Sequence, residues 1–145
     1  MTPASLSAWE RELIRDEGCV LTAYKDSRGF LTIGVGRFID VGGGISKDEA
    51  FYLLRNDMTR VLSECRQAFP WFEGLDEVRQ RAIASMAFNL GLSKLKQFTN
   101  TLAAVARGDY AQAADGMLKS LWARQVKGRA VRLATMMRDG RDQST

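Results

Sequence analysis

The chain has 145 residues, of which 46% are hydrophobic and 26% are charged, and its 21 basic and 17 acidic residues give a net charge of +4. The length and composition are those of one soluble globular domain that needs neither disulfides nor a metal to fold. The positive net charge favours an anionic partner, which is nucleic acid, a membrane surface or an acidic wall polymer. The chain contains no histidine, which excludes Ser-His-Asp and Cys-His nucleophile systems and histidine-based zinc sites. Any general acid or base must therefore be Asp, Glu, Lys, Tyr or Cys.

The N-terminal segment has the pattern of an amphipathic helix. A capping box of Ser7 and Glu10 places its start at Ser5 or Ser7, and Gly18 marks its end. No export signal is visible in the first seven residues, and no apolar stretch approaches the roughly 18–20 residues of a membrane span. We therefore expect the chain to accumulate in the cytoplasm of the cell that makes it. Apolar residues recur at helical spacing at Leu6, Trp9, Leu13 and Ile14.

A small β lobe is predicted over about 19–45, where glycines alternate with β-branched and aromatic residues. The turn 26–29 lies between 21–24 and 30–33, which predicts a hairpin. A second hairpin or loop is expected to close at 42–44. The two cysteines, Cys19 in this lobe and Cys65 beyond it, are too few for a disulfide scaffold. They could pair with each other, but we expect both to be buried free thiols.

A long helix is predicted to join this lobe to the rest of the chain. Ser46 and Glu49 form a second capping box, and the helix reaches about Arg66. Its apolar residues follow the 3.6-residue period of a helix. They are Ala50, Leu53, Leu54, Met58, Val61, Leu62 and Cys65.

The remaining sequence predicts shorter helices up to about Arg138, the first of them capped by Asp76. We therefore expect an α+β, predominantly α-helical fold as a single domain over 1–145. Its helical lobe is expected to comprise 1–18 and 67–145, with a cleft between this lobe and the β lobe. Breaks between the helices are expected at Pro70, Gly74, Gly91, Gly108 and Gly128.

One constellation of residues carries the chemistry. Residues 17–18 read Glu-Gly, residues 24–29 read Tyr-x-Asp-x-x-Gly, and residues 32–36 read Thr-Ile-Gly-x-Gly. At this spacing the sequence resembles the phage-type lysozymes, the muramidases of glycoside hydrolase family 24. The resemblance continues at 45–50 and through shorter motifs as far as Trp122, so it covers most of the chain.

The chemistry of two carboxylates supports the same interpretation. Glu17 is expected at the C-terminal end of a helix, where the negative pole and partial burial between the lobes disfavour its ionised form, so that it can donate a proton. Asp26 opens a polar turn whose backbone N–H groups keep it ionised, and Thr32 lies across the hairpin, where its hydroxyl helps to hold one water. Taken singly, Glu17 is an ordinary surface carboxylate, Asp26 a residue that caps a turn and Thr32 a residue that favours a strand. The spacing of the three together favours glycoside hydrolysis. The glycines of the 32–36 motif are expected to let the hairpin backbone approach the cleft and the helix behind it.

The resemblance assigns roles to these residues. Glu17 is the general acid, and Asp26 with Thr32 positions the attacking water, which gives inversion at the anomeric carbon. By the resemblance, the substrate-binding residues are Phe38, Phe88, Thr101 and Arg129, and Arg129 approaches Glu17. A further cleft position falls on Gly116, which lacks the amide side chain usual in the family. Phe88 also fits the apolar stripe of its own helix, so that a core role stays open.

The resemblance implies an endolysin that cleaves the β-1,4 bond between N-acetylmuramic acid and N-acetylglucosamine of peptidoglycan. It acts without a cofactor, as a monomer, in the periplasm after release through a holin-type lesion. A catalytically silent peptidoglycan-binding module on the same fold is the alternative; a nucleic-acid binder is rejected because no recognition helix is visible. A basic C-terminal surface either is a solvated face or attracts an anionic outer-membrane or wall surface. Its residues are Lys119, Arg124, Lys127 and Arg132.

Overall fold

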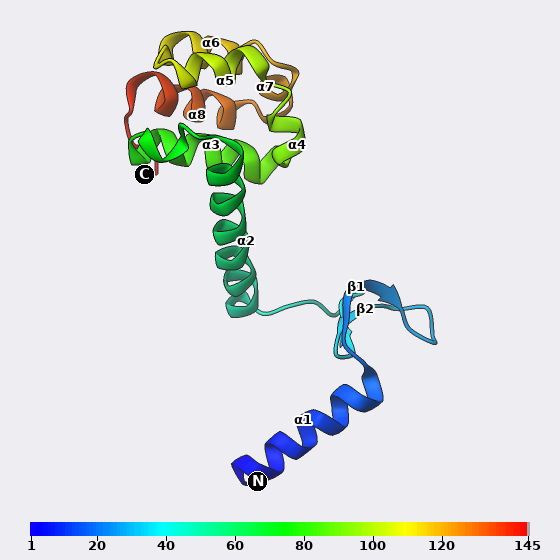
Figure 1. The fold of residues 1–145 in the computed structure, drawn as a ribbon. Helices are drawn as coiled ribbons and strands as arrows, with labels where there is room; N and C mark the ends of the chain where they lie inside the picture. Colours follow the sequence, from blue (N-terminus) through cyan, green and yellow to red (C-terminus); the bar gives the residue numbers. More distant parts are fainter. Residues whose placement is uncertain (145) are drawn as a thin grey trace. The chain divides into compact units, whose positions relative to one another are not determined.

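The computed structural model describes residues 1–144, and the chain divides into two compact units, Met1–Tyr52 and Leu53–Thr145. We call them the sheet unit and the helical unit. Both contain helices, and the one sheet of the described residues is small and antiparallel, which confirms the α+β, predominantly helical class (Figure 1). The first helix is grouped with the sheet, and the expected single domain with residues 1–18 in the helical lobe stays a prediction.

Helix α1 spans Pro3–Glu17. Its N-cap is Thr2, whose hydroxyl accepts a hydrogen bond from the amide of Ser5 at 3.2 Å. The expected start at Ser5 or Ser7 is wrong, because threonine followed directly by proline forms a better start than the later capping box. The expected end at Gly18 is confirmed: this glycine has a φ of 75° and its amide donates to the last turn of the helix.

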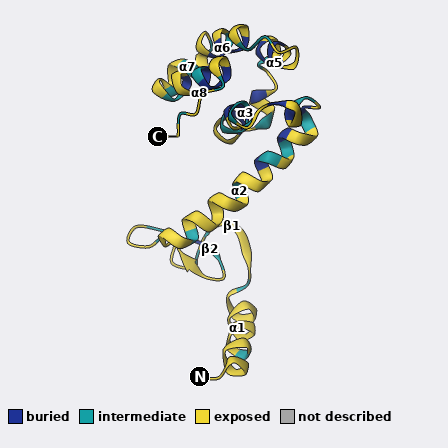
Figure 2. Ribbon diagram, turned by 90° about the vertical axis from the view of Figure 1, so that its left-hand side faces the viewer, coloured by how far each residue is buried: buried dark blue, intermediate teal, exposed yellow. Residues whose placement is uncertain are grey.

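None of the residues of α1 is buried (Figure 2). Its apolar side chains lie on one face, and together with Val35 they line a shallow hollow of the sheet unit. Thr32 is the one buried residue among those described in this unit. The exposed apolar residues of α1 are Leu6, Trp9, Leu13 and Ile14.

The sheet has three antiparallel strands in the order β1-β2-β3. Tyr24 on β1 lies opposite Thr32 on β2, and Thr32 in turn lies opposite Phe38 on β3. The middle strand therefore places Thr32 between two aromatic residues. The strands are β1 at Val20–Lys25, β2 at Leu31–Gly34 and β3 at Arg37–Phe38.

The turn expected at 26–29 is confirmed as the connection between β1 and β2. The chain turns again directly after β2, so that the second hairpin closes at 35–36. Of the hairpin or loop expected to close at 42–44, the loop is confirmed, and it leads to the next helix. Glycine 36 has a φ of 67°, a conformation that other residues rarely adopt, which explains why this tight turn contains it.

Helix α2 spans Lys47–Ala68, and its predicted capping box is confirmed. The amide of Glu49 donates to the Ser46 hydroxyl at 3.1 Å, and the amide of Ser46 donates to the Glu49 carboxylate at 2.7 Å. The guanidinium of Arg37 donates to both oxygens of the same carboxylate, at 2.9 and 2.7 Å. These bonds, that of Arg37 above all, lower the pKa of Glu49 to about 2. Strand β3 and the start of α2 are therefore joined by a bidentate ion pair.

The helical unit contains every buried hydrophobic side chain among the described residues, from Val61 to Met137. Asp76 caps α3 as expected, accepting from the amide of Arg79 at 3.0 Å. Near the C-terminal end of α3, Asn89 accepts at its side-chain oxygen a hydrogen bond of 2.8 Å from the indole of Trp122. The elements of this unit after α2 are η1 at Phe72–Gly74, α3 at Glu77–Leu90, α4 at Leu92–Leu95, α5 at Thr99–Ala106, α6 at Tyr110–Leu118, α7 at Leu121–Val126 and α8 at Gly128–Asp139.

Arg79 joins α3 to the end of α8. Its guanidinium donates to the backbone oxygens of Met137 and Arg138, at 2.7 and 3.0 Å, and so satisfies carbonyls that the helix end leaves unpaired. It also donates to Asp76 at 2.8 Å and lies 3.9 Å from the ring centroid of Tyr110. One side chain thus connects a helix start, a helix end and an aromatic ring.

Both cysteines are free. Cys65 is buried as expected, and burial raises the pKa of its thiol to about 11. Cys19 is exposed, so its expected burial is wrong: it lies just before β1 in the unit that has little core. Within residues 1–144, no helix combines the length and the apolar character that crossing a membrane requires.

Candidate active site

A pocket of about 410 Å³ lies in the sheet unit. It brings together the three residues predicted to be catalytic, Glu17 from the end of α1, Asp26 from the first turn and Thr32 from β2. Phe38, predicted to bind substrate, lines the same pocket. The lining also contains residues to which the sequence analysis gave no separate role. The complete set is Glu17, Tyr24, Asp26, Arg28, Phe30, Thr32, Gly36 and Phe38.

Glu17 lies directly against the second hairpin. A Cβ atom built on Gly36 would lie 2.9 Å from Oε2 of Glu17 and 3.3 Å from its Cγ. The expectation that glycine lets the hairpin approach the helix is therefore confirmed at Gly36. At Gly34 no atom would meet such a Cβ within 4 Å, so that this glycine serves the backbone conformation alone, with a φ of 70°.

The two oxygens of Asp26 have different environments. Oδ1 accepts hydrogen bonds from the amides of Arg28 and Phe30, both at 2.9 Å. This confirms the expected backbone donors, which fix the carboxylate within its own turn. Oδ2 accepts no hydrogen bond from the described residues. One oxygen is thus held by the turn, and the other is left for a ligand or water.

The hydroxyl of Thr32 is oriented by its neighbour. Thr32 is 5% exposed, and its Oγ1 donates to the backbone oxygen of Phe30 at 3.1 Å. Because this bond uses the hydroxyl proton, the lone pairs of Oγ1 are left as acceptors. A water in the pocket can donate to them.

Two phenylalanine rings form an aromatic wall of the pocket. The rings of Phe30 and Phe38 meet edge to face, with centroids 5.6 Å apart and an angle of 74°. A Cβ on Gly43 would overlap the ring of Phe38, so that this glycine leaves room for the ring. Phe30 was missed by the sequence analysis, although its place directly after the 24–29 motif is a signal that could have found it.

Asp40 holds the loop that follows Phe38. Its carboxylate accepts from the amides of Leu31 and Val41, both at 2.8 Å. The bond from Leu31, followed by that from Val41, lowers the pKa of Asp40 below its usual range. This loop is therefore tied back to β2, next to the aromatic wall.

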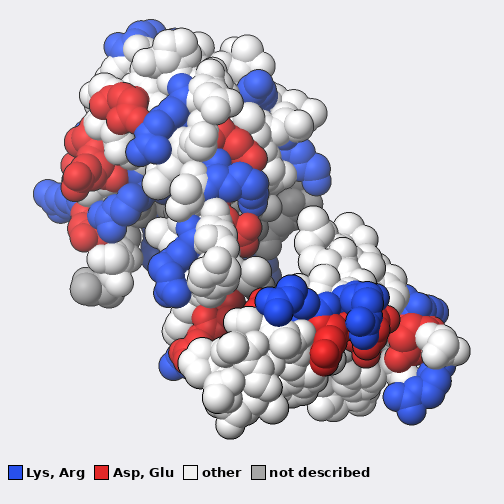
Figure 3. Space-filling model, turned by 60° about the horizontal axis from the view of Figure 1, so that its bottom comes forward, with Lys and Arg blue, Asp and Glu red and all other residues white. Residues whose placement is uncertain are grey.

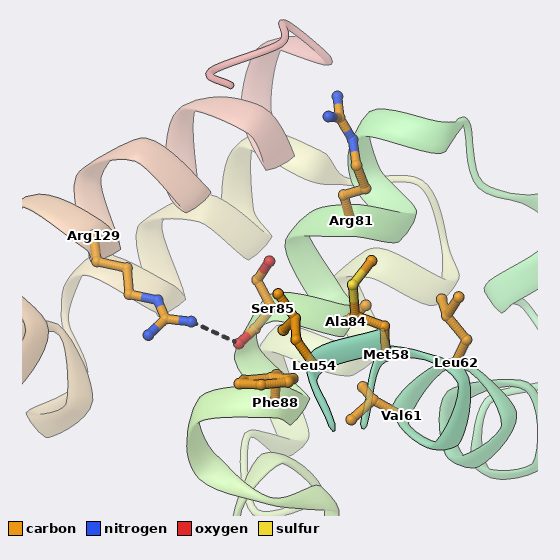
Figure 4. Close-up of a pocket in the computed structure, with 9 residues that line it drawn as sticks. All are labelled: Leu54, Met58, Val61, Leu62, Arg81, Ala84, Ser85, Phe88 and Arg129. Atoms are coloured by element: carbon orange, nitrogen blue, oxygen red, sulfur yellow. Dashed lines mark hydrogen bonds between the residues drawn. The ribbon is translucent and has the colours of Figure 1, made fainter. Parts of the chain in front are cut away.

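Three predicted substrate-binding residues lie in the helical unit. Phe88 and Arg129 line a groove of about 390 Å³, where Nη2 of Arg129 is 3.5 Å from the backbone oxygen of Ser85 (Figure 4). Phe88 is 44% exposed. Thr101 is buried, and a Cβ on Gly116 would overlap its hydroxyl. The substrate contacts of these residues, and the approach of Arg129 to the acid, stay predictions.

The basic residues of the C-terminal helices are exposed. Within residues 1–144, no acidic side chain pairs with Lys119, Arg124, Lys127 or Arg132, whereas Arg138 pairs with Asp115 at 3.3 Å. Arg124 and Lys127 line a shallow hollow on α7 and α8. On the face of the molecule shown in Figure 3, basic and acidic side chains are interspersed. The four residues are Lys119, Arg124, Lys127 and Arg132.

Comparison with known proteins shows the family to which the chain belongs. A sequence model of the phage lysozyme family matches residues 15–139. Such a match, over a fold with two carboxylates in one pocket, supports a muramidase-type hydrolase of the cell wall. The chain belongs to the phage lysozyme family.

Individual relatives differ in how much of their length the chain covers. It is 31% identical to the pre-baseplate central spike protein Gp5 of Enterobacteria phage T4, over 88% of this chain and 27% of that protein. It is 26% identical to the probable T4-type lysozyme 1 of Dictyostelium discoideum, over 86% of this chain and 90% of the relative. It is 25% identical to the peptidoglycan hydrolase gp36 of Pseudomonas phage phiKMV, over 84% of this chain and 14% of the relative.

Proposed function

We propose that this protein is an endolysin that hydrolyses the β-1,4 bond between N-acetylmuramic acid and N-acetylglucosamine in peptidoglycan. The observation that carries the proposal is the pocket that contains Glu17, Asp26 and Thr32 together. Membership in the phage lysozyme family supports the substrate class. The reaction uses only carboxyl and hydroxyl groups of the chain.

Glu17 is the general acid of the proposed reaction. Its protonated carboxyl donates to the glycosidic oxygen as the bond from that oxygen to the anomeric carbon breaks, and the leaving sugar departs as an alcohol. The position of the carboxyl supports this role, because it lies in the pocket at the C-terminal end of α1.

Asp26 and Thr32 position the water. One hydrogen of the water is donated to Oδ2 of Asp26 and the other to Oγ1 of Thr32, so that a lone pair of the water oxygen is directed at the anomeric carbon. As the new bond forms, Asp26 takes the proton of the water. The free Oδ2 and the oriented hydroxyl support this assignment. Attack from the face opposite the leaving group inverts the anomeric carbon.

Substrate contacts are proposed on both units. The aromatic wall around Phe38 offers an apolar face of the kind on which sugar rings pack. In the helical unit, Phe88 and Arg129 line a groove that combines an exposed ring with a guanidinium. We propose that each surface contacts glycan.

The proposal is tested by turbidity clearing of chloroform-permeabilised Gram-negative cells, with reducing ends measured in the supernatant. The wild type clears the cells, and Glu17→Gln loses at least about 10²–10⁴-fold of the rate, the usual contribution of a general acid. The control is Asp16→Asn, which removes an exposed carboxylate paired with Arg15 and leaves clearing unchanged. Clearing by Glu17→Gln at the wild-type rate contradicts the proposal.

The alternative of a silent wall-binding module has its own outcome in this experiment. Neither protein then clears the cells, although both are folded and sediment with purified walls. A 1,6-anhydro end in place of a reducing end identifies a lytic transglycosylase, which needs the acid but no water.

We also propose that the protein reaches its substrate in the periplasm through a holin-type lesion. What supports this step is that the chain belongs to the phage lysozyme family. Expression of the protein in a Gram-negative host, with and without a holin, tests this step. Lysis is expected only in the culture that also expresses the holin. Equal lysis in both cultures contradicts a holin requirement.

A further inference from the structure

Arg28 lies in the same pocket as the carboxylates, at a fixed place relative to one of them. It is the single basic residue among the eight described residues that line the pocket. Its own amide donates to Oδ1 of Asp26 at 2.9 Å, so that both side chains start from one hydrogen-bonded turn. A ligand that enters this pocket therefore meets Arg28 as well as Asp26.

The guanidinium is held by an aromatic ring and not by an acid. Its Cζ lies 5.4 Å from the ring centroid of Phe30, which in turn packs edge to face on Phe38. Within residues 1–144 the guanidinium donates to no carboxylate and no carbonyl, whereas the guanidinium of Arg37 in the same unit donates to Glu49. Its planar set of N–H donors is thus available to a ligand.

The charges around it indicate which ligand. In the proposed reaction Asp26 is the charged carboxylate of the pocket, and its charge repels an anionic substrate but leaves an uncharged one unaffected. A basic residue in the same pocket serves a substrate that is itself anionic. In peptidoglycan the sugar rings are uncharged, but every muramoyl residue carries a stem peptide with free carboxylates. Guanidinium binds carboxylate through paired, charge-assisted hydrogen bonds.

We propose that Arg28 forms a subsite for a stem-peptide carboxylate. The inference rests on the proposed function, because it names the part of the wall that the same pocket recognises. Phe30 orients the guanidinium, and the turn that fixes Asp26 fixes the subsite with it.

The test compares native sacculi with sacculi whose carboxylates have been amidated with methylamine and a carbodiimide. Release of reducing ends gives kcat and KM for the wild type, Arg28→Gln and Arg28→Lys. On native wall, Arg28→Gln raises KM about tenfold, the effect of one charge-assisted hydrogen bond, and raises it more than it lowers kcat. Arg28→Lys gives an intermediate KM because it keeps the charge and loses the planar donor pair. On amidated wall the ratio of the two KM values, Arg28→Gln to wild type, falls to about one.

Arg11→Gln is the matched control, since it removes an exposed guanidinium of the same unit outside the pocket and keeps the wild-type KM. An unchanged KM of Arg28→Gln on native wall overturns the subsite. An equal rise on native and amidated wall also overturns it, because the residue then acts on the turn or on phosphate of the wall and not on carboxylate. Failure of the proposed function looks different: the wild type itself releases no reducing ends from native sacculi.

Discussion

The sheet unit and the helical unit differ in the contacts that stabilise each of them internally. In the sheet unit Thr32 is the one buried residue described, whereas the helical unit contains the whole apolar core of the described residues (Figure 2). Yet the pocket with the two carboxylates lies in the sheet unit. The region with the least core thus carries the proposed chemistry.

The sheet unit compensates for its small core with polar contacts and glycines. The bidentate pair of Arg37 and Glu49, the amides on Asp26 and the close approach at Gly36 each fix one part of the pocket. Such contacts set the position of a side chain without burying much apolar surface. We therefore expect substitutions in this unit to affect activity more than stability, and substitutions in the helical unit to do the reverse.

Among the substitutions that compare the two units, the largest effect is expected at Gly36. Gly36→Ala places a methyl group against Glu17 and forces a φ of 67° on alanine, so that the acid moves. Misplacement by about 1 Å can lower kcat about 10²-fold. Gly34→Ala is the control, because it has the same backbone strain with nothing within 4 Å. Reducing-end kinetics check both, and equal losses in the two variants would show that strain alone matters.

In the helical unit, Ile83→Ala removes a fully buried side chain from α3. The loss of buried surface and the cavity left behind lower the free energy of unfolding by about 2–5 kcal/mol. Below the melting temperature kcat keeps its wild-type value. Denaturant unfolding together with kinetics measures this, beside Val131→Ala, which truncates a side chain that is 57% exposed. A kcat that falls in proportion to stability would remove the distinction between the units.

A smaller effect concerns pH. Burial raises the pKa of Asp76, but hydrogen bonds from the side chain and amide of Arg79 lower it by more, so that it lies below its usual range. The charged form thus stabilises the fold above the ordinary value of about 3.9, and this contribution is lost as the pH falls through the lowered pKa. Asp76→Asn keeps an N-cap acceptor and loses only the charge. We expect its Tm at pH 7 to be roughly 2–4 °C lower, with the difference shrinking below pH 4.

Thermal unfolding at several pH values checks this prediction. Asp109→Asn, at the N-cap of α6, is the control. The ion pair of Asp109 with Arg107 is longer, at 3.8 Å, so that we expect a smaller decrease in Tm for this variant. A constant difference between Asp76→Asn and the wild type from pH 7 to pH 3 would mean that the charge is not what stabilises the helix start.

The smallest effect is expected at the basic surface, which we propose attracts the anionic wall. The triple variant Arg124→Gln/Lys127→Gln/Arg132→Gln weakens binding to whole walls a few-fold at low salt, and the difference disappears at about 1 M salt. A sedimentation assay measures it. The control removes three arginines that already form ion pairs, and it changes the net charge equally. Equal binding by both variants would make this surface an ordinary solvated face. The three control residues are Arg60, Arg66 and Arg107.

Much of the fold could be predicted because its signals are local. The capping box at Ser46, the cap at Asp76 and the turn at 26–29 each depend on residues a few positions apart, and all three are confirmed. The motif also indicated which residues share the pocket. The start of α1 was misplaced because two capping signals compete there and the threonine–proline pair prevails.

Contacts between distant residues could not be predicted in this way. Nothing in the sequence pairs Arg79 with the end of α8, 58 positions away, or chooses Glu49 as the partner of Arg37. The exposure of Cys19 likewise depends on how little core surrounds β1. These features follow from the packing of whole elements, which a periodic pattern does not encode.

The proposed reaction depends most on a water held by Asp26 and Thr32 opposite the acid, and one measurement tests this directly. A soluble peptidoglycan oligomer is digested in an NMR tube, and the anomeric proton of the new reducing end is followed before mutarotation. The account predicts that the α-anomer forms first, since attack by that water inverts the β-linkage. Initial formation of the β-anomer would contradict it.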